Sequence, residues 1–137
     1  MMPATPVQAL RIDDPLEKVT AVQALCSALP RVAIDSVSMR AAIAEPPGLP
    51  GRPAKPPLVP AKQVATRSPF TAAGRAALLH AVAHIELNAV DLHWDIIARF
   101  THVPMPLGVY DDWVRAADDE AKHFNLMSDC LEGLGSH

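Results

Sequence analysis

The sequence of 137 residues is poor in aromatic side chains, in cysteine and in long apolar runs. Aromatic residues make up 4% of it, and no uninterrupted run of about 18 apolar residues occurs, so we expect no transmembrane helix and no membrane partner. It also lacks an N-terminal basic segment followed by an apolar stretch, the pattern of a secretory signal. Two cysteines far apart in such a chain indicate reduced thiols, and we expect a cytoplasmic protein.

Excess positive charge is missing as well. The 12 basic and 15 acidic residues leave a net charge of −3, whereas a nucleic-acid-binding domain is typically basic, and we therefore predict no nucleic-acid partner. Alternating strand patterns, a glycine-rich phosphate loop and a serine or cysteine nucleophile motif are absent too. The remaining pattern, with apolar residues at helical spacing, predicts an all-α fold.

Proline divides the chain into three parts. Eight of the 14 prolines fall in residues 46–69, a stretch with four basic residues and no acidic one. Because proline interrupts helices and central strands, we predict an extended strap there, with a docking motif for a proline-recognising domain as the alternative. This gives an N-terminal helical segment (1–45), a proline-rich strap (46–70) and a helical hairpin (71–137).

Local signals place the helices within these parts. Asp14, Pro15 and Glu17 have the pattern of a helix start, and apolar residues then recur at helical spacing until Pro30: Leu16, Val19, Val22, Leu25 and Leu29. A second, short helix is predicted over 36–44. Long helices are predicted over 71–101 and 109–132, joined by a short Pro/Gly turn, which makes an antiparallel pair.

Two carboxylates lie on the apolar stripes of these long helices. At about 100° per residue, Glu86 falls in the middle of the stripe of its helix. The opposite side of that helix collects the polar residues His80, His84, Asn88, Asp91 and Asp95. On the second helix, Glu120 and His123 share the apolar stripe, one turn apart. Two carboxylates and an imidazole are therefore expected to point into the core.

A metal ion would explain these polar groups on apolar stripes. A carboxylate buried alone costs several kcal/mol, and a divalent cation keeps it charged. One Glu on a helix facing Glu-x-x-His on the next is the ligand pattern of di-iron and di-manganese helical bundles. We predict Glu86, Glu120 and His123 as ligands of iron or manganese, since the set is oxygen-rich and has no thiolate. The alternative is a Glu–His pair without metal, in the core or at the surface.

Other histidines are weaker candidates. His93 lies on the same stripe two turns from Glu86, about 10.5 Å along the helix, which is too far for the same ion. We interpret it as a hydrogen-bonded core or channel histidine behind the ligands. His80 and His84 share the other face at a spacing that can bind zinc, although such a pair more often contacts solvent or packs against the strap.

The two long helices carry sequences that resemble a known family. The segments Gly74–Leu92 and Tyr110–Phe124 resemble the DUF455 family, an uncharacterised family of the ferritin-like superfamily. The resemblance implies half of a ferritin-like four-helix bundle and assigns metal ligation to Glu86, Glu120 and His123. The segment Asp119–His123 is also similar to the Asp-Glu-x-Arg-His box of bacterial di-iron monooxygenases. That similarity implies that Asp119 hydrogen-bonds a metal-bound histidine.

The chain has half of the ligands that the resemblance implies. Family members continue into a second helix pair, so the remaining ligands would come from a second copy in a homodimer or from another chain that supplies the C-terminal half. The leading functional hypothesis is a non-haem di-metal protein, of the oxygen-activating oxidoreductase or hydroxylase type if it is an enzyme. The alternative is a non-catalytic helical assembly module, or a fragment that no longer binds a di-metal centre.

Overall fold

The computed structural model describes residues 5–28, 48–100, 103 and 105–136, and these residues form helices and irregular segments without a strand. The all-α prediction is therefore confirmed. In chain order the elements are α1 (Pro6–Leu10), α2 (Pro15–Ala28), the short 3-10 turn η1 (Ala61–Gln63), α4 (Ala72–Arg99) and α5 (Leu107–Gly133). None of the described helices is both long and apolar enough to cross a bilayer.

Helices α4 and α5 form the predicted antiparallel hairpin. Thr71 caps α4, because its hydroxyl accepts a hydrogen bond from the backbone N–H of Gly74 at 3.0 Å. Helix α5 ends where Gly135 adopts a φ of +71°, which lets the N–H of Ser136 reach back to the carbonyl of Leu131 at 2.9 Å. Both helices begin and end within two residues of the predicted bounds.

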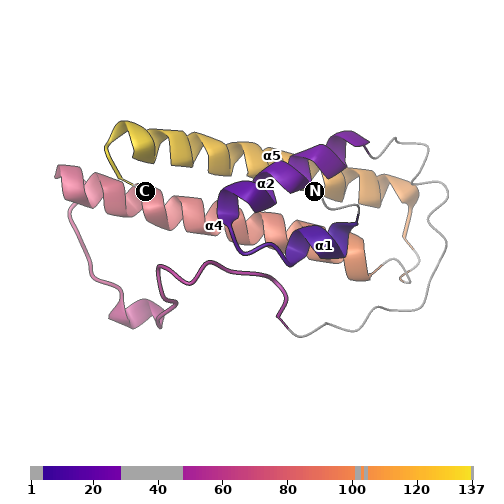
Figure 1. Ribbon diagram of the computed structural model, residues 1–137, viewed down its shortest axis with the longest axis horizontal. Coiled ribbons are helices and arrows are strands. Elements are labelled where there is room, and N and C mark those ends of the chain that lie inside the picture. The colour runs from indigo at the N-terminus through magenta and orange to yellow at the C-terminus, as the bar shows by residue number, and fades with distance from the viewer. Residues whose placement is uncertain (1–4, 29–47, 101–102, 104, 137) are drawn as a thin grey trace.

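Helices α1 and α2 lie along one side of this hairpin (Figure 1). Asp14 caps α2 as predicted, since its carboxylate accepts from the N–H of Glu17 at 2.8 Å. The sequence analysis missed α1, although Thr5 and Gln8 form a capping box and Pro6 occupies its first turn. The short helix predicted over 36–44 lies outside the described residues.

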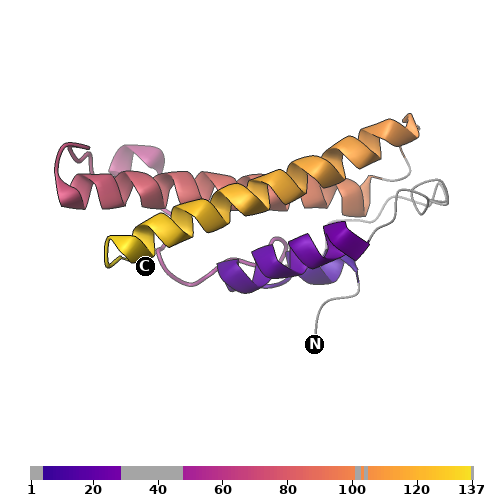
Figure 2. The same ribbon diagram turned by 90° about the horizontal axis from the view of Figure 1, so that it is seen from above.

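The core is built where α1 and α2 meet the hairpin. Trp94 and Val90 of α4 are fully buried there, together with Leu10, Val19 and Val22. Seen from above, α1 and α2 run along one side of the α4–α5 pair, while the opposite side has no long helix among the described residues (Figure 2). The apolar stripes of the hairpin are therefore covered on one side.

Two residues of the helical stripes are placed differently from the prediction. Leu16 was assigned to the apolar stripe of α2, but it is 48% exposed, and Lys18 is buried in its stead. Asp91 was assigned to the polar outer side of α4, but it is 5% exposed. Asp91 is buried because α1 and α2 pack on that side of α4, and Lys18 is buried because it pairs with Asp91 there.

The described part of the strap, 48–70, has no helix except η1, in agreement with the prediction of an extended segment. Its start is held against α1, since the N–H of Gly51 donates to the carbonyl of Leu10 at 2.7 Å. A Cβ atom at Gly51 would lie 2.5 Å from the carbonyl oxygen of Arg11. This close approach requires glycine.

Candidate metal centre

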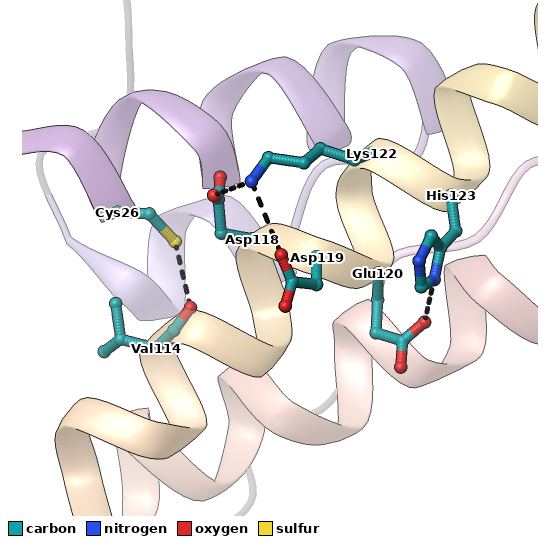
Figure 3. A network of polar contacts seen from close by, with 7 residues as sticks. All are labelled: Cys26, Val114, Asp118, Asp119, Glu120, Lys122 and His123. Atoms are coloured by element: carbon teal, nitrogen blue, oxygen red, sulfur yellow. Dashed lines mark hydrogen bonds and ion pairs between the residues drawn. The ribbon is translucent and has the colours of Figure 1, made fainter. Parts of the chain in front are cut away.

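The three predicted ligands come together between α4 and α5. The Nδ1 atom of His123 lies 3.0 Å from Oε2 of Glu120, one turn earlier on α5, and 3.4 Å from Oε2 of Glu86 on α4. One ligand atom of each residue lies within 4.8 Å of the other two. Figure 3 shows Glu120 and His123 extending from α5 toward the ribbon of α4. The antiparallel register of the hairpin thus places Glu86 opposite Glu120 and His123.

The cluster is less buried than its position on the apolar stripes suggested. The side chains of Glu86 and Glu120 are 20% and 25% exposed, and that of His123 is 51% exposed. The expectation that all three point into the core is therefore wrong for His123. The reason is that α2 covers another side of α5: Val114 and Asn125, which contact α2, fall on the opposite side of the helix from His123 at about 100° per residue.

The two carboxylates influence each other's protonation. A side-chain hydrogen bond with Glu120, followed by burial, raises the pKa of Glu86. The same hydrogen bond is the main cause that lowers the pKa of Glu120, and the contact with Glu120 raises the pKa of His123. These directions describe a proton that Glu86 holds toward the Glu120 carboxylate, beside an imidazole that favours its charged form. A cation could take the place of these protons.

Asp119 takes part in a different contact. Its carboxylate lies 3.4 Å from Nζ of Lys122, which also pairs with Asp118 at 2.9 Å. Figure 3 shows this ion-pair group on the side of α5 near α2, apart from the Glu120–His123 contact. The role of Asp119 toward a metal-bound histidine remains a prediction, and the structure shows its carboxylate near Lys122.

His93 lies on α4 in the layer next to the cluster. Its ring packs against that of Trp113, with centroids 5.1 Å apart and planes at 42°. The Nδ1 atom is buried and has no hydrogen-bond partner among the described residues. His93 also lowers the pKa of Glu120, as a weaker cause behind the contacts with Glu86 and His123, which places it near the carboxylates. The hydrogen bond expected for His93 is thus not made by its Nδ1 atom within the described part of the chain, and its role behind the ligands stays a prediction.

The pair His80 and His84 forms no metal-ligand group among the described residues. Instead, Nε2 of His80 lies 3.0 Å from the hydroxyl of Ser136, beyond the end of α5, and His84 is exposed. The exposure of His84 agrees with the alternative in which the pair contacts solvent, and His80 contacts a residue near the C-terminus.

The sequence analysis missed a second polar cluster, on the other side of α4. Nζ of Lys18 donates to Asp91 at 2.8 Å and to the carbonyl of Gly51 at 2.6 Å, and both side chains are nearly inaccessible to solvent. A signal was available, since Lys18 lies one turn before Val22, and Asp91 lies one turn from both Leu87 and Trp94. A charged residue one turn from large apolar residues lies on the same face of its helix as they do, and that face is buried here.

The three-residue cluster has the donors for a cation. Two carboxylates and one imidazole, without a thiolate, are ligands typical of iron and manganese sites in helical proteins. The atoms already lie close enough to bind one ion after small rotations of the side chains. Metal ligation itself remains a prediction at this point.

Comparison with known proteins places the chain in a family. The family described as "Protein of unknown function (DUF455)" matches residues 11–137. A protein of Haemophilus influenzae, described as "Uncharacterized protein", is 36% identical over 133 residues. The aligned part covers 93% of this chain and 46% of the relative, so the chain spans about half the length of the curated relative it matches. No solved structure matches the chain. Because the match extends over most of its residues, the chain belongs to the DUF455 family.

Proposed function

We propose that this chain contributes to a non-haem di-metal carboxylate centre that holds iron or manganese, in a protein of the ferritin-like type. The observation that carries the proposal is the convergence of Glu86, Glu120 and His123 from two adjacent helices, with ligand atoms within 4.8 Å. A Glu on one helix opposite Glu-x-x-His on the next is half of the ligand set that ferritin-like di-metal bundles use. The raised pKa of Glu86 adds support, because a carboxylate that keeps a proton here is one that a cation could stabilise.

Each residue has a distinct role in this proposal. Glu86 and Glu120 would hold the cation through carboxylate oxygens from the two helices, and His123 would supply a nitrogen ligand. A reduced di-iron centre supplies the activation of dioxygen, which makes oxidation or hydroxylation the reaction class. His93 and Trp113, whose rings pack against each other, would form a wall of the site beside the ligands.

Metal titration with matched variants tests the proposal. Fe²⁺ is added under anaerobic conditions to the chain and to three variants, Glu86→Gln, Glu120→Gln and His123→Asn, and bound iron is measured after gel filtration. We expect each variant to bind Fe²⁺ at least about tenfold more weakly. Tenfold is a lower bound, because the loss of a residue that only supports a ligand already weakens metal binding by about this factor. Admission of dioxygen to the loaded native chain should then change its optical spectrum.

Glu132→Gln is the control, because Glu132 is an exposed carboxylate on the same helix outside the cluster. It should bind Fe²⁺ as the native chain does. Equal iron binding by Glu86→Gln and Glu132→Gln would contradict the proposal and favour the helical assembly module. Circular dichroism of every variant excludes unfolding as the cause of a lost site.

A further inference from the structure

The side of the hairpin away from α1 and α2 exposes large aliphatic side chains. Leu78 and Ile85 of α4 are 53% and 61% exposed, and Leu92, which is 59% exposed, continues their line to the pocket where the strap and Leu10 of α1 meet α4. They recur every seven residues, which places them along one line on the helix surface. Leu126 of α5 is 57% exposed as well. Side chains of this size at regular spacing form a surface to which another helix can pack.

The candidate metal centre opens toward this same side. Ile85 directly precedes Glu86, and the imidazole of His123 is half exposed beside it. The cluster offers three ligand atoms, whereas manganese and similar cations take about six in octahedral oxygen-rich sites. Further ligands must therefore approach from the exposed side, over the aliphatic line.

We propose that this open side is a metal-dependent interface between two copies of the chain, an inference that rests on the proposed function. In a two-fold dimer the same patch meets itself, so a cluster near the axis is doubled. Two copies bring four carboxylates and two imidazoles together, and two divalent cations balance the four negative charges. A cation bound by side chains of both copies would link them, whereas in the metal-free chain each cluster keeps its own protons. The dimer and the metal are thereby coupled, and each stabilises the other.

Sedimentation velocity with Mn²⁺ tests the interface directly. We expect the chain to sediment as a monomer of 14.7 kDa in EDTA and as a dimer in Mn²⁺, with about one bound Mn²⁺ per chain by elemental analysis. Manganese is chosen because it binds the same donors without oxidation under air at neutral pH. The mass and the metal content are measured on the same sample.

Two variants separate the interface from the ligands. Ile85→Glu places a charge on the line of Leu78, Ile85 and Leu92 without removing a ligand. It should lower the association constant of the dimer in Mn²⁺ at least about tenfold. Leu16→Glu is the matched control, because Leu16 is 48% exposed on α2, on the covered side of the hairpin, and it should dimerise as the native chain does. Equal dimerisation of both variants would overturn the proposed interface.

The outcomes also separate the inference from the proposed function. Bound Mn²⁺ on a chain that stays monomeric would overturn the dimer and leave the metal site intact. A dimer that is equally stable in EDTA would overturn the coupling to metal. Absence of bound Mn²⁺ and Fe²⁺ would contradict the proposed function, and with it the metal-dependent dimer.

Discussion

Helix α4 carries two carboxylates in contrasting environments, Glu86 and Asp91. Asp91 faces α2 and is held by Lys18 at 2.8 Å in a cluster closed by the carbonyl of Gly51. Glu86 faces α5 on the open side and meets a second carboxylate, Glu120, beside a half-exposed imidazole. The Asp91 cluster contains its own cation, Lys18. The Glu86 cluster has two acids and a single titratable base.

This difference distinguishes a structural ion pair from a candidate binding site. A buried carboxylate with a lysine partner already has a balanced charge and gains nothing from another ligand. Two carboxylates that share a proton and retain solvent access can exchange that proton for a cation. The same helix thus carries one acid whose charge is balanced by a buried lysine and one acid that meets a second carboxylate near solvent. Four experiments test this contrast.

The largest expected effect comes from removing one partner of the buried pair. Lys18→Met leaves Asp91 buried without its cation, and Asp91→Asn leaves Lys18 without its anion. We expect each to lower the free energy of unfolding by about 3–5 kcal/mol, measured by urea denaturation. Arg115→Met is the control, because it breaks the exposed pair with Asp111 and should cost less than about 1 kcal/mol. Similar losses of unfolding free energy for the buried and the exposed pair would contradict the interpretation of Lys18 and Asp91 as a structural ion pair.

A smaller effect is expected at the strap. Gly51→Ala would place a Cβ atom 2.5 Å from the carbonyl oxygen of Arg11 and push away the strap carbonyl that accepts from Lys18. The loss should be about 1–3 kcal/mol in the free energy of unfolding, as for an overpacked site. Gly108→Ala is the comparison, since no atom lies within 4 Å of a Cβ atom there. It should not destabilise the chain, and equal losses would argue against the strap contact.

Glu86→Gln should affect stability in the opposite direction from Asp91→Asn. The contact with Glu120 raises the pKa of Glu86 in the folded chain above its unfolded value. The folded state therefore binds a proton that the unfolded state releases, and the stability of the metal-free chain falls as pH rises through that raised pKa. The variant lacks this titration, so at pH 8 it should be slightly more stable than the native chain, by less than about 1 kcal/mol.

Thermal melts of both proteins in EDTA between pH 4 and pH 8 measure this difference. The native curve should decline with rising pH relative to the variant curve. Glu120 affects stability in a lower pH range. Its pKa is lowered, so the stability that its charged form contributes is lost only as the pH falls below the usual pKa of a glutamate. Parallel curves for the native chain and Glu86→Gln would show that the two carboxylates do not share a proton.

The smallest effect, on reactivity and not on stability, concerns the two cysteines. Cys26 faces α5, where its thiol donates to the carbonyl of Val114 at 3.6 Å and burial raises its pKa to about 12 (Figure 3). Cys130 is exposed. Since the thiolate is the reactive form, iodoacetamide at pH 8 should add one label per chain, seen by intact mass, and Cys130→Ser should remain unlabelled. Rapid labelling of Cys26 would show that α2 separates readily from α5.

Local sequence signals were sufficient for α2, α4 and α5 and for the cluster of Glu86, Glu120 and His123. Thr71 and Pro106 directly precede the two long helices, and glycines follow Leu131 at the end of α5. Such signals can be recognised in the sequence because caps and breakers act on neighbouring residues alone. The spacing of Glu120 and His123 places them one turn apart on any α-helix, and a short turn makes α4 and α5 antiparallel. These features bring Glu86 opposite the pair, as the structure shows.

The burial of each helix side was decided by the tertiary structure. A helical wheel ranks the sides of α4 by polarity, but it does not contain the positions of α1 and α2, which cover Asp91 and leave Ile85 exposed. The pairing of Lys18 with Asp91 joins residues 73 positions apart. Helix periodicity extends over a few turns, whereas such a contact depends on how separate helices pack. Local sequence patterns thus predicted the long helices and the cluster of Glu86, Glu120 and His123, whereas the packing of the helices decided that Asp91 is buried and that His123 keeps access to solvent.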